Sequence, residues 1–104
     1  MKFLHFVMFD AAKAADVAEA GDKFWAKPPP GMKQLATYLC LGMPFPDVPP
    51  NTVVGIDVIE AETAEALTAF FYPMGLAGAS QQWCVPVLEL PVGGAAKMEK
   101  KIRG

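Results

Sequence analysis

Hydrophobic residues are concentrated in four short stretches of the chain, which are separated by segments rich in polar residues, proline or glycine. The four stretches cover residues 2–9, 33–42, 52–60 and 82–90. Short apolar runs that are bounded by turn-forming residues and contain many β-branched and aromatic side chains are typical of β-strands. The pattern therefore predicts four strands.

Two of the intervening segments repeat their apolar residues with the spacing of an α-helix. The first helix is predicted at about residues 11–26, after Asp10, whose side chain is suited to cap it. Its apolar positions fall on one face at i, i+4 and i+7: Val17, Gly21 and Phe24. The second helix is predicted to begin near Thr63, a natural N-cap, with Glu65 in its first turn. The residues expected on its buried face are Leu67, Phe70, Phe71 and Met74.

The predicted elements follow the order β-α-β-β-α-β, which is that of a ferredoxin-like α+β domain. Right-handed crossovers in both β-α-β halves place the third strand between the first and second, and the fourth strand outside the first. We therefore expect a four-stranded antiparallel sheet with strand order 4-1-3-2. The 104 residues suffice for one such domain. We assign it to residues 1–92 and interpret residues 93–104 as a basic C-terminal tail of weak order.

Both faces of this sheet are predicted to be apolar. In residues 2–9 the alternating side chains are Phe3, Val7 and Phe9 on one face and Leu4, Phe6 and Met8 on the other. A strand with one face in water normally alternates apolar and polar residues, and two helices cover only one face of the sheet. Because the predicted elements include no third helix, we expect a homodimer in which the second face packs against another copy of the chain.

Composition and charge disfavour several classes of function. No apolar run reaches the roughly 18–20 residues that a membrane-spanning helix needs, and the N-terminus lacks the pattern of a signal peptide, so we expect a cytoplasmic protein that does not bind membranes. Residues 1–96 contain five lysines and ten acidic residues, whereas the tail KMEKKIRG carries a net charge of +3. An acidic body disfavours binding to nucleic acid. The tail is either a solvated end or an arm that reaches an acidic neighbouring subunit.

Several short motifs resemble a known family. They are MKFL at the start, PPPGMK before the second strand, ETAEAL at the start of the second helix and VPVLEL at the end of the fourth strand. The length, element order and doubly apolar sheet resemble the dimeric α/β-barrel superfamily of ferredoxin-like proteins, and the motifs resemble the uncharacterised family called domain of unknown function 3303. The resemblance covers about residues 1–91. It implies a dimer with a ligand cavity inside each subunit, between sheet and helices.

The only histidine of the chain, His5, interrupts the first apolar strand, and Asp57 interrupts the third strand in the same way. Because these strands are antiparallel neighbours in the predicted sheet, the two side chains can face one another if the register allows it. One interpretation is a hydrogen-bonded core histidine. The other is a catalytic group in which His5 is the acid or base, Asp57 orients it and Tyr38 binds a substrate oxygen.

The candidate ligand-binding residues are Trp83, Trp25, Phe71 and Cys84. We expect them either to line a pocket for a small apolar or aromatic ligand or to serve in core packing. Cys40 and Cys84 are expected to be unpaired thiols on opposite edges of the sheet. No metal site or cofactor is predicted, because the histidine, cysteines and carboxylates show no ligand spacing and there is no glycine-rich phosphate loop.

Two classes of function remain open after these considerations. The first is a small-molecule binding or accessory protein that uses the pocket between sheet and helices of a dimeric α/β barrel. The second is a cofactor-free enzyme of the isomerase, lyase or monooxygenase type, acting on a small organic acid, a lactone or an aromatic compound.

Overall fold

The computed structural model describes residues 1–104 of the chain. Its sheet consists of four strands: β1 (Lys2–Asp10), β2 (Met32–Leu39), β3 (Thr52–Ala61) and β4 (Ala79–Val87). The strands lie in the order β2-β3-β1-β4, and every neighbouring pair is antiparallel. This is the predicted order 4-1-3-2 read from the opposite edge, so the predicted ferredoxin-like α+β fold is confirmed.

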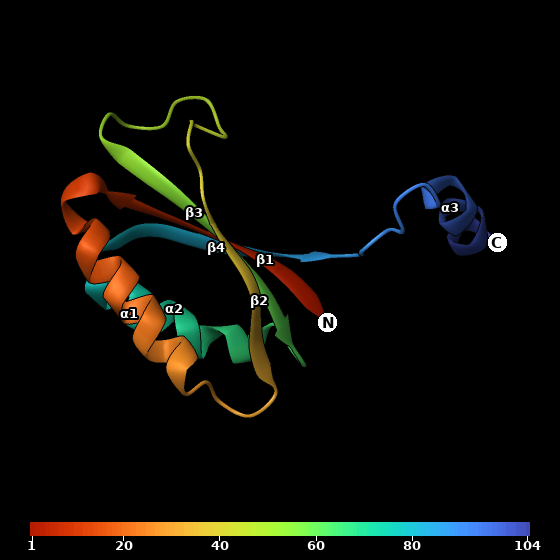
Figure 1. The fold of residues 1–104 in the computed structure, drawn as a ribbon, viewed down its shortest axis with the longest axis horizontal. Helices are drawn as coiled ribbons and strands as arrows, with labels where there is room; N and C mark the ends of the chain where they lie inside the picture. Colours follow the sequence, from red (N-terminus) through yellow and green to blue (C-terminus); the bar gives the residue numbers. More distant parts are fainter.

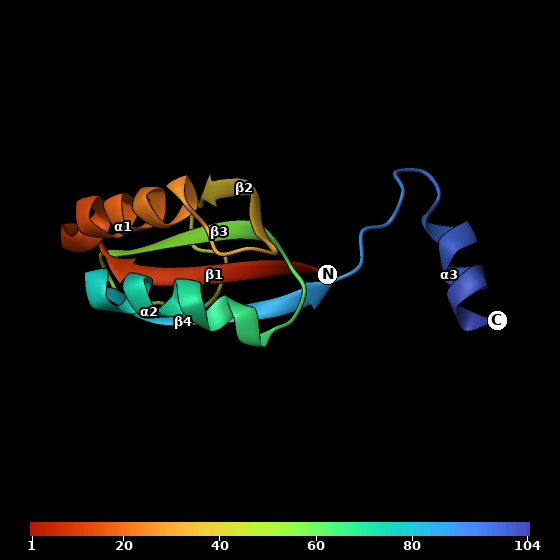
Figure 2. The ribbon, with the colours of Figure 1, turned by 90° about the horizontal axis from the view of Figure 1, so that it is seen from below.

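Two helices, α1 (Ala14–Ala26) and α2 (Thr68–Ala77), lie side by side on one face of the sheet (Figures 1 and 2). A short 3₁₀ turn precedes each helix, at Ala11–Lys13 and at Glu65–Leu67. Because these turns come first, the α-helical hydrogen bonding starts about one turn later than the sequence pattern predicts.

The predicted helix caps are present, and they close the 3₁₀ turns. Asp10 Oδ1 accepts a hydrogen bond from the amide of Ala12 at 2.9 Å. Thr63 Oγ1 accepts one from the amide of Ala66 at 3.2 Å. Each cap satisfies a backbone donor that the start of a helix leaves without an internal partner.

The core lies between the sheet and the two helices. Odd-numbered residues of β1 and β3 point toward the helices, since Phe3 pairs with Ile59 and Val7 pairs with Gly55. The buried cluster on this side is Phe3, Val7, Phe9, Val17, Met32, Ile59, Ala61, Leu67, Phe70 and Met74. It contains the residues predicted for the buried face of the second helix except Phe71, which is partly buried against it.

β4 begins and ends earlier in the sequence than predicted. Val87 pairs with Lys2, the first residue of β1, so the backbone after Val87 has no partner strand. At its other end β4 extends back to Ala79, which pairs with Phe9 beyond a register shift between Met8 and Phe9. The length of a strand is set here by its neighbour, which an apolar run by itself does not reveal.

No helix covers the opposite face of the sheet, which we call the open face. Phe6 of β1 stacks on Trp83 of β4 with ring centroids 5.2 Å apart, and Phe45 of the loop before β3 packs against both rings. Tyr38 and Val85 on this face are 61% and 43% exposed. The second apolar face that the sequence predicts is therefore present, and part of it is accessible to a partner.

The C-terminal segment leaves the body after β4 and ends in helix α3 (Ala95–Arg103), which stands apart from the body in both views (Figures 1 and 2). A helix thus forms where the sequence pattern favours weak order. Its basic side chains are all exposed: Lys97, Lys100, Lys101 and Arg103. None of the helices is both long and apolar enough to cross a membrane.

Candidate functional site

His5 and Asp57 lie directly opposite each other on β1 and β3 and point toward the helices. His5 Nδ1 is 3.0 Å from Asp57 Oδ2. His5 is fully buried, and Asp57 is 6% exposed. The predicted pairing of these residues on one face of the sheet is confirmed, and it places a titratable pair in the core.

Two glutamines extend this pair into a hydrogen-bond network. His5 Nε2 is 2.9 Å from Gln82 Oε1 of β4, and the amide nitrogen of Gln82 donates to the carbonyl oxygen of Phe71 in α2 at 2.8 Å. On the other side, Gln34 of β2 donates from Nε2 to Asp57 Oδ1 at 2.9 Å. The network therefore connects all four strands of the sheet to helix α2.

The hydrogen bonds of Gln82 determine which of its side-chain atoms faces His5. Because the amide nitrogen of Gln82 donates to Phe71, its carbonyl oxygen is the atom that faces His5. Both ring nitrogens of His5 thus face oxygen acceptors, and an imidazolium that donates at both positions satisfies the network. In that form the carboxylate of Asp57 compensates the positive charge, as a buried charge requires.

Aromatic rings of α2 close the space around His5. The rings of Phe70 and Phe71 contact it edge-on, with centroid distances of 4.8 and 5.0 Å. His5 therefore has no open space beside it and no route to solvent. The reachable end of the pair is Asp57, which reverses the roles that the sequence suggests for the two residues.

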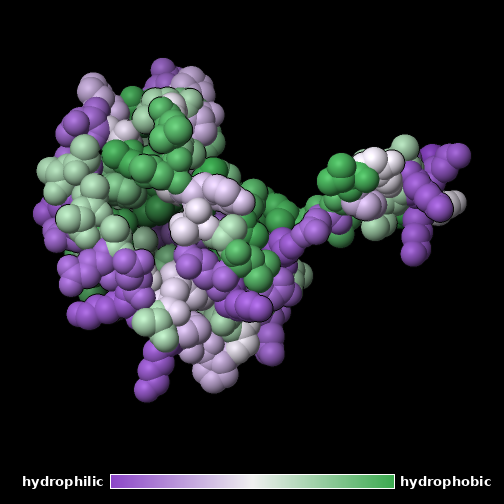
Figure 3. Space-filling model, viewed as in Figure 1, coloured by the Kyte–Doolittle hydropathy of each residue, from purple (hydrophilic) through white to green (hydrophobic).

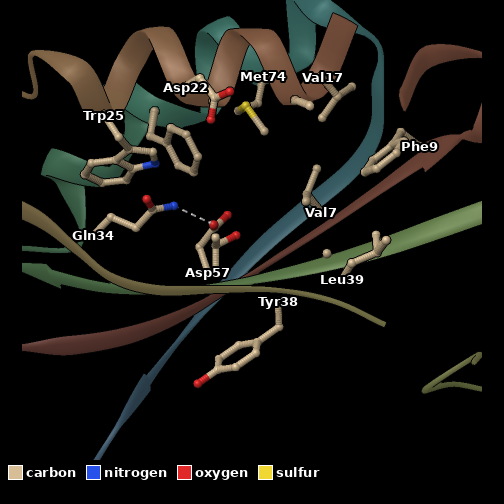
Figure 4. Close-up of a pocket in the computed structure, with 15 residues that line it drawn as sticks. Val7, Phe9, Val17, Asp22, Trp25, Gln34, Tyr38, Leu39, Asp57 and Met74 are labelled. Atoms are coloured by element: carbon tan, nitrogen blue, oxygen red, sulfur yellow. Dashed lines mark hydrogen bonds between the residues drawn. The ribbon is translucent and has the colours of Figure 1, made fainter. Parts of the chain in front are cut away.

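A cavity of about 400 Å³ lies beside Asp57, between helix α1 and the sheet (Figure 4). Most of its wall is apolar, with Val7, Phe9, Val17, Trp25, Phe70 and Met74 among the lining residues. Asp57 and Gln34 form the polar part of the inner wall, and Asp22 of α1 lies at the exposed side. In the space-filling view, a hollow with hydrophobic residues in and around it is visible in this region (Figure 3).

Trp25, one of the residues that line this cavity, carries an unsatisfied donor. Its indole nitrogen Nε1 is buried and has no hydrogen-bond partner. Its indole packs against Phe24 and Phe70, with centroid distances of 4.8 and 4.9 Å. In Figure 4 the nitrogen of Trp25 is turned toward the interior of the cavity, on the side where Gln34 and Asp57 lie.

Tyr38 does not join His5 and Asp57, contrary to the expectation from the sequence. It pairs with Ile56, and its neighbour Thr37 is the residue opposite Asp57. A register shift between Gln34 and Ala36 inserts one extra residue into β2 and turns every later side chain to the other face. Tyr38 is among the residues that line the cavity, but its ring points away from the interior (Figure 4).

The four candidate ligand-binding residues are distributed over three places. Trp25 lines the cavity described above. Phe71 and Cys84 line a second, smaller hollow of about 270 Å³ on the other side of the His5 pair. Trp83 does not line either space, because it pairs with Phe6 and both rings lie on the open face.

Sequence reasoning missed Gln34 and Gln82, which complete the network. Each is a polar residue in an otherwise apolar strand, so the signal that marks His5 and Asp57 was present for them as well. For Gln34, however, the face depends on the register shift in β2. Gln82 is the first residue of the predicted strand and is therefore expected to mark its end. It lies inside the strand only because β4 begins at Ala79.

The arrangement offers no metal centre and no activated thiol. No group of three or more histidine, cysteine, aspartate or glutamate side chains is placed to hold a metal ion. Both cysteines are free. Burial raises the pKa of the Cys84 thiol from 9.0 to about 12, and the negative charge of Asp57 adds to the increase. Cys84 is therefore an uncharged thiol at neutral pH and a poor nucleophile.

Comparisons with known proteins support the fold and go no further. No family model and no curated protein sequence matches the chain, so the resemblance to the domain of unknown function 3303 family stays a prediction. Among solved structures, the C-terminal domain of the MgtC protein from Mycobacterium tuberculosis is similar, with a TM-score of 0.60 and 7% identity over 81% of this chain and 84% of that one.

A second solved structure is a dimeric ferredoxin-like protein of unknown function from Thermobifida fusca YX. Its TM-score is 0.46, with 16% identity over 82% of this chain and 88% of that one. At these identities, structural likeness concerns the fold alone.

The buried pair predicts an unequal response to single and double substitution. His5→Leu leaves the Asp57 carboxylate buried without its counter-charge and is expected to lower the free energy of unfolding by about 3–5 kcal/mol. In the double variant His5→Leu/Asp57→Leu no charge remains, so we expect it to be more stable than His5→Leu alone. Urea unfolding at one fixed protein concentration measures both effects. Additive losses would show that the two residues do not act as a charge pair.

The raised pKa of Cys84 predicts slow alkylation. With a pKa of about 12, its thiolate fraction at pH 8 is at least about a hundredfold below that of an ordinary cysteine. Iodoacetamide at pH 8 is therefore expected to modify Cys84 of the folded protein at least about a hundredfold more slowly than in urea, as followed by peptide mass spectrometry. Equal rates in the folded and unfolded chain would contradict this assignment.

Proposed function

We propose that the protein binds a small, largely apolar molecule in the cavity between helix α1 and the sheet. The volume of about 400 Å³ falls in the range of about 300–1,000 Å³ that is usual for small-molecule sites. The combination of an apolar wall with a few convergent polar groups is also characteristic of such sites. The aromatic side chains in the wall favour a flat or aromatic ligand.

The observation that carries this proposal is the buried indole nitrogen of Trp25. A buried donor without a partner costs about 1–3 kcal/mol, and this one has none. A ligand that accepts its hydrogen bond removes that cost on binding. The proposal therefore explains a feature that packing alone leaves unexplained.

A specific position in α1 keeps the cavity open. Gly21 lines it, and a Cβ atom at this position would have Met74 Sδ as its nearest neighbour, at 3.9 Å. A Cβ atom therefore fits there in ordinary van der Waals contact with Met74, and a longer side chain would occupy part of the cavity that Gly21 lines. Because glycine inside a helix is less favourable than alanine by about 0.5–1 kcal/mol, the empty position is consistent with selection for the space itself.

We propose in addition that the functional unit is a homodimer, as the dimeric α/β-barrel resemblance implies. The open face exposes side chains such as Leu35, Tyr38 and Val85, which are 42%, 61% and 43% exposed. Stacked aromatic rings lie beside them. A second copy of the same face is the partner that closes this apolar surface with two-fold symmetry.

Turnover of the bound molecule is the second candidate function. Asp57 is a carboxylate in the cavity wall, backed by His5, and such a group can exchange a proton with a ligand. Chemical analysis of a ligand recovered after incubation with the protein distinguishes an enzyme, which returns a changed compound, from a binding protein.

The binding proposal is tested by NMR with neutral two-ring probes, namely naphthalene, 2-methoxynaphthalene and 2-naphthol. The chain has two tryptophans, so the indole N–H signals of Trp25 and Trp83 can be followed separately. We expect at least one probe to shift the Trp25 signal and leave that of Trp83 in place.

A pair of substitutions in α1 controls for the site. Gly21→Leu fills the cavity and is expected to abolish the shift of the Trp25 signal, whereas Ala15→Leu, at an exposed position of the same helix that does not line the cavity, preserves it. If no probe perturbs Trp25, or if Gly21→Leu binds as well as the unaltered protein, the cavity is not the binding site.

The dimer is tested by sedimentation velocity at micromolar concentration, where we expect the mass of two chains. Val85→Lys places an unpaired charge in the proposed interface and should give monomers with native circular dichroism. Leu76→Lys is the matched control, because Leu76 is 73% exposed on α2, away from the open face. A folded monomer for the unaltered chain would rule out the dimer.

A further inference from the structure

We infer that the cavity selects ligands that donate a hydrogen bond to Asp57 and carry no negative charge. This inference rests on the proposed binding function and adds the chemical class of the ligand. A hydroxyl or amide group on an apolar body is the type of ligand that meets both conditions.

The charged residues that line the cavity are all acidic. They are Asp57 and Asp22, and no lysine or arginine is among the fifteen lining residues. His5 lies behind Asp57, because it is fully buried and does not line the cavity. A ligand therefore meets carboxylate oxygens and no cationic group.

Asp57 retains capacity to accept a hydrogen bond from a ligand. Its Oδ2 atom is engaged by His5 and its Oδ1 atom by Gln34, each through one side-chain hydrogen bond. A carboxylate oxygen accepts two hydrogen bonds, so an acceptor position remains on each oxygen. A hydrogen bond to a charged acceptor is stronger than one between neutral groups.

A carboxylate ligand would face the opposite situation. It would bring a further negative charge into a mostly apolar space beside Asp57, and the indole N–H of Trp25 is a neutral donor that cannot compensate it. This argues against the small organic acids that the sequence leaves open as substrates. Alcohols, phenols and amides remain.

A hydroxyl group can use both polar features of the cavity at the same time. Its oxygen accepts from the Trp25 nitrogen, which has no partner in the protein, while its hydrogen is donated to Asp57. In Figure 4 these two groups border the same part of the cavity, with Gln34 between them. An ether can accept from Trp25 but cannot donate to Asp57. A simple hydrocarbon makes neither contact.

Three probes of similar size separate these possibilities: 2-naphthol, 2-methoxynaphthalene and 2-naphthoate. The dissociation constants are measured from the Trp25 indole signal at neutral pH, with Trp83 as the internal reference. We expect 2-naphthol to bind about tenfold more tightly than 2-methoxynaphthalene, the difference that one charge-assisted hydrogen bond provides. We expect 2-naphthoate to bind more weakly than both.

Asp57→Asn is the matching variant, and it is expected to reduce the preference for 2-naphthol and to weaken the rejection of 2-naphthoate. If this variant does not fold, the ranking of the probes on the unaltered protein still decides. Equal affinities for 2-naphthol and 2-methoxynaphthalene, or tightest binding of 2-naphthoate, would overturn the inference and leave the binding site in place. Failure of all neutral probes to shift Trp25 would instead overturn the proposed function itself.

Discussion

The buried pair of His5 and Asp57 is the constraint on which the rest of the structure depends. Two charges in a core are tolerated only when each has its counter-charge and its remaining polar atoms have partners. Here Gln82 from β4, Gln34 from β2 and a main-chain carbonyl of α2 supply those partners. A slip of one residue between any two strands would separate the pair or its glutamines, so the polar network specifies the register that apolar side chains alone leave less defined.

The same network explains why the cavity lies on one side of the pair. Toward β4 it ends at α2, where Phe70 and Phe71 seal the imidazole from solvent. Toward β2 it ends at Asp57 and Gln34, which border open space. The two faces of the sheet therefore differ in what they contain. The face under the helices contains the polar network and the cavity, and the open face, with its stacked aromatic rings, is available for another copy.

Much of the fold could be predicted from the sequence, because apolar periodicity and crossover handedness determine the strand order. The pairing of His5 with Asp57 could also be predicted, since the two residues lie near the middle of adjacent antiparallel strands. The position of Tyr38 could not. It depends on one extra residue in β2 between Gln34 and Ala36, and such a bulge arises from pairing with β3 and not from any local pattern. The face on which Trp83 lies could not be predicted either, because periodicity does not distinguish the two faces of a strand that is apolar on both.

Two glycines beside the cavity show the difference between a packing requirement and an unfilled space. A Cβ atom at Gly55 would approach Val7 Cγ1 to 3.2 Å, so Val7 would have to move by a few tenths of an ångström to make room for it. At Gly21 the nearest atom would be 3.9 Å away, and a helix is more stable with alanine than with glycine. Packing therefore accounts for Gly55 and does not account for Gly21. The glycine at the wall of this cavity and the donor without a partner beside it both support the proposal that a ligand occupies the space.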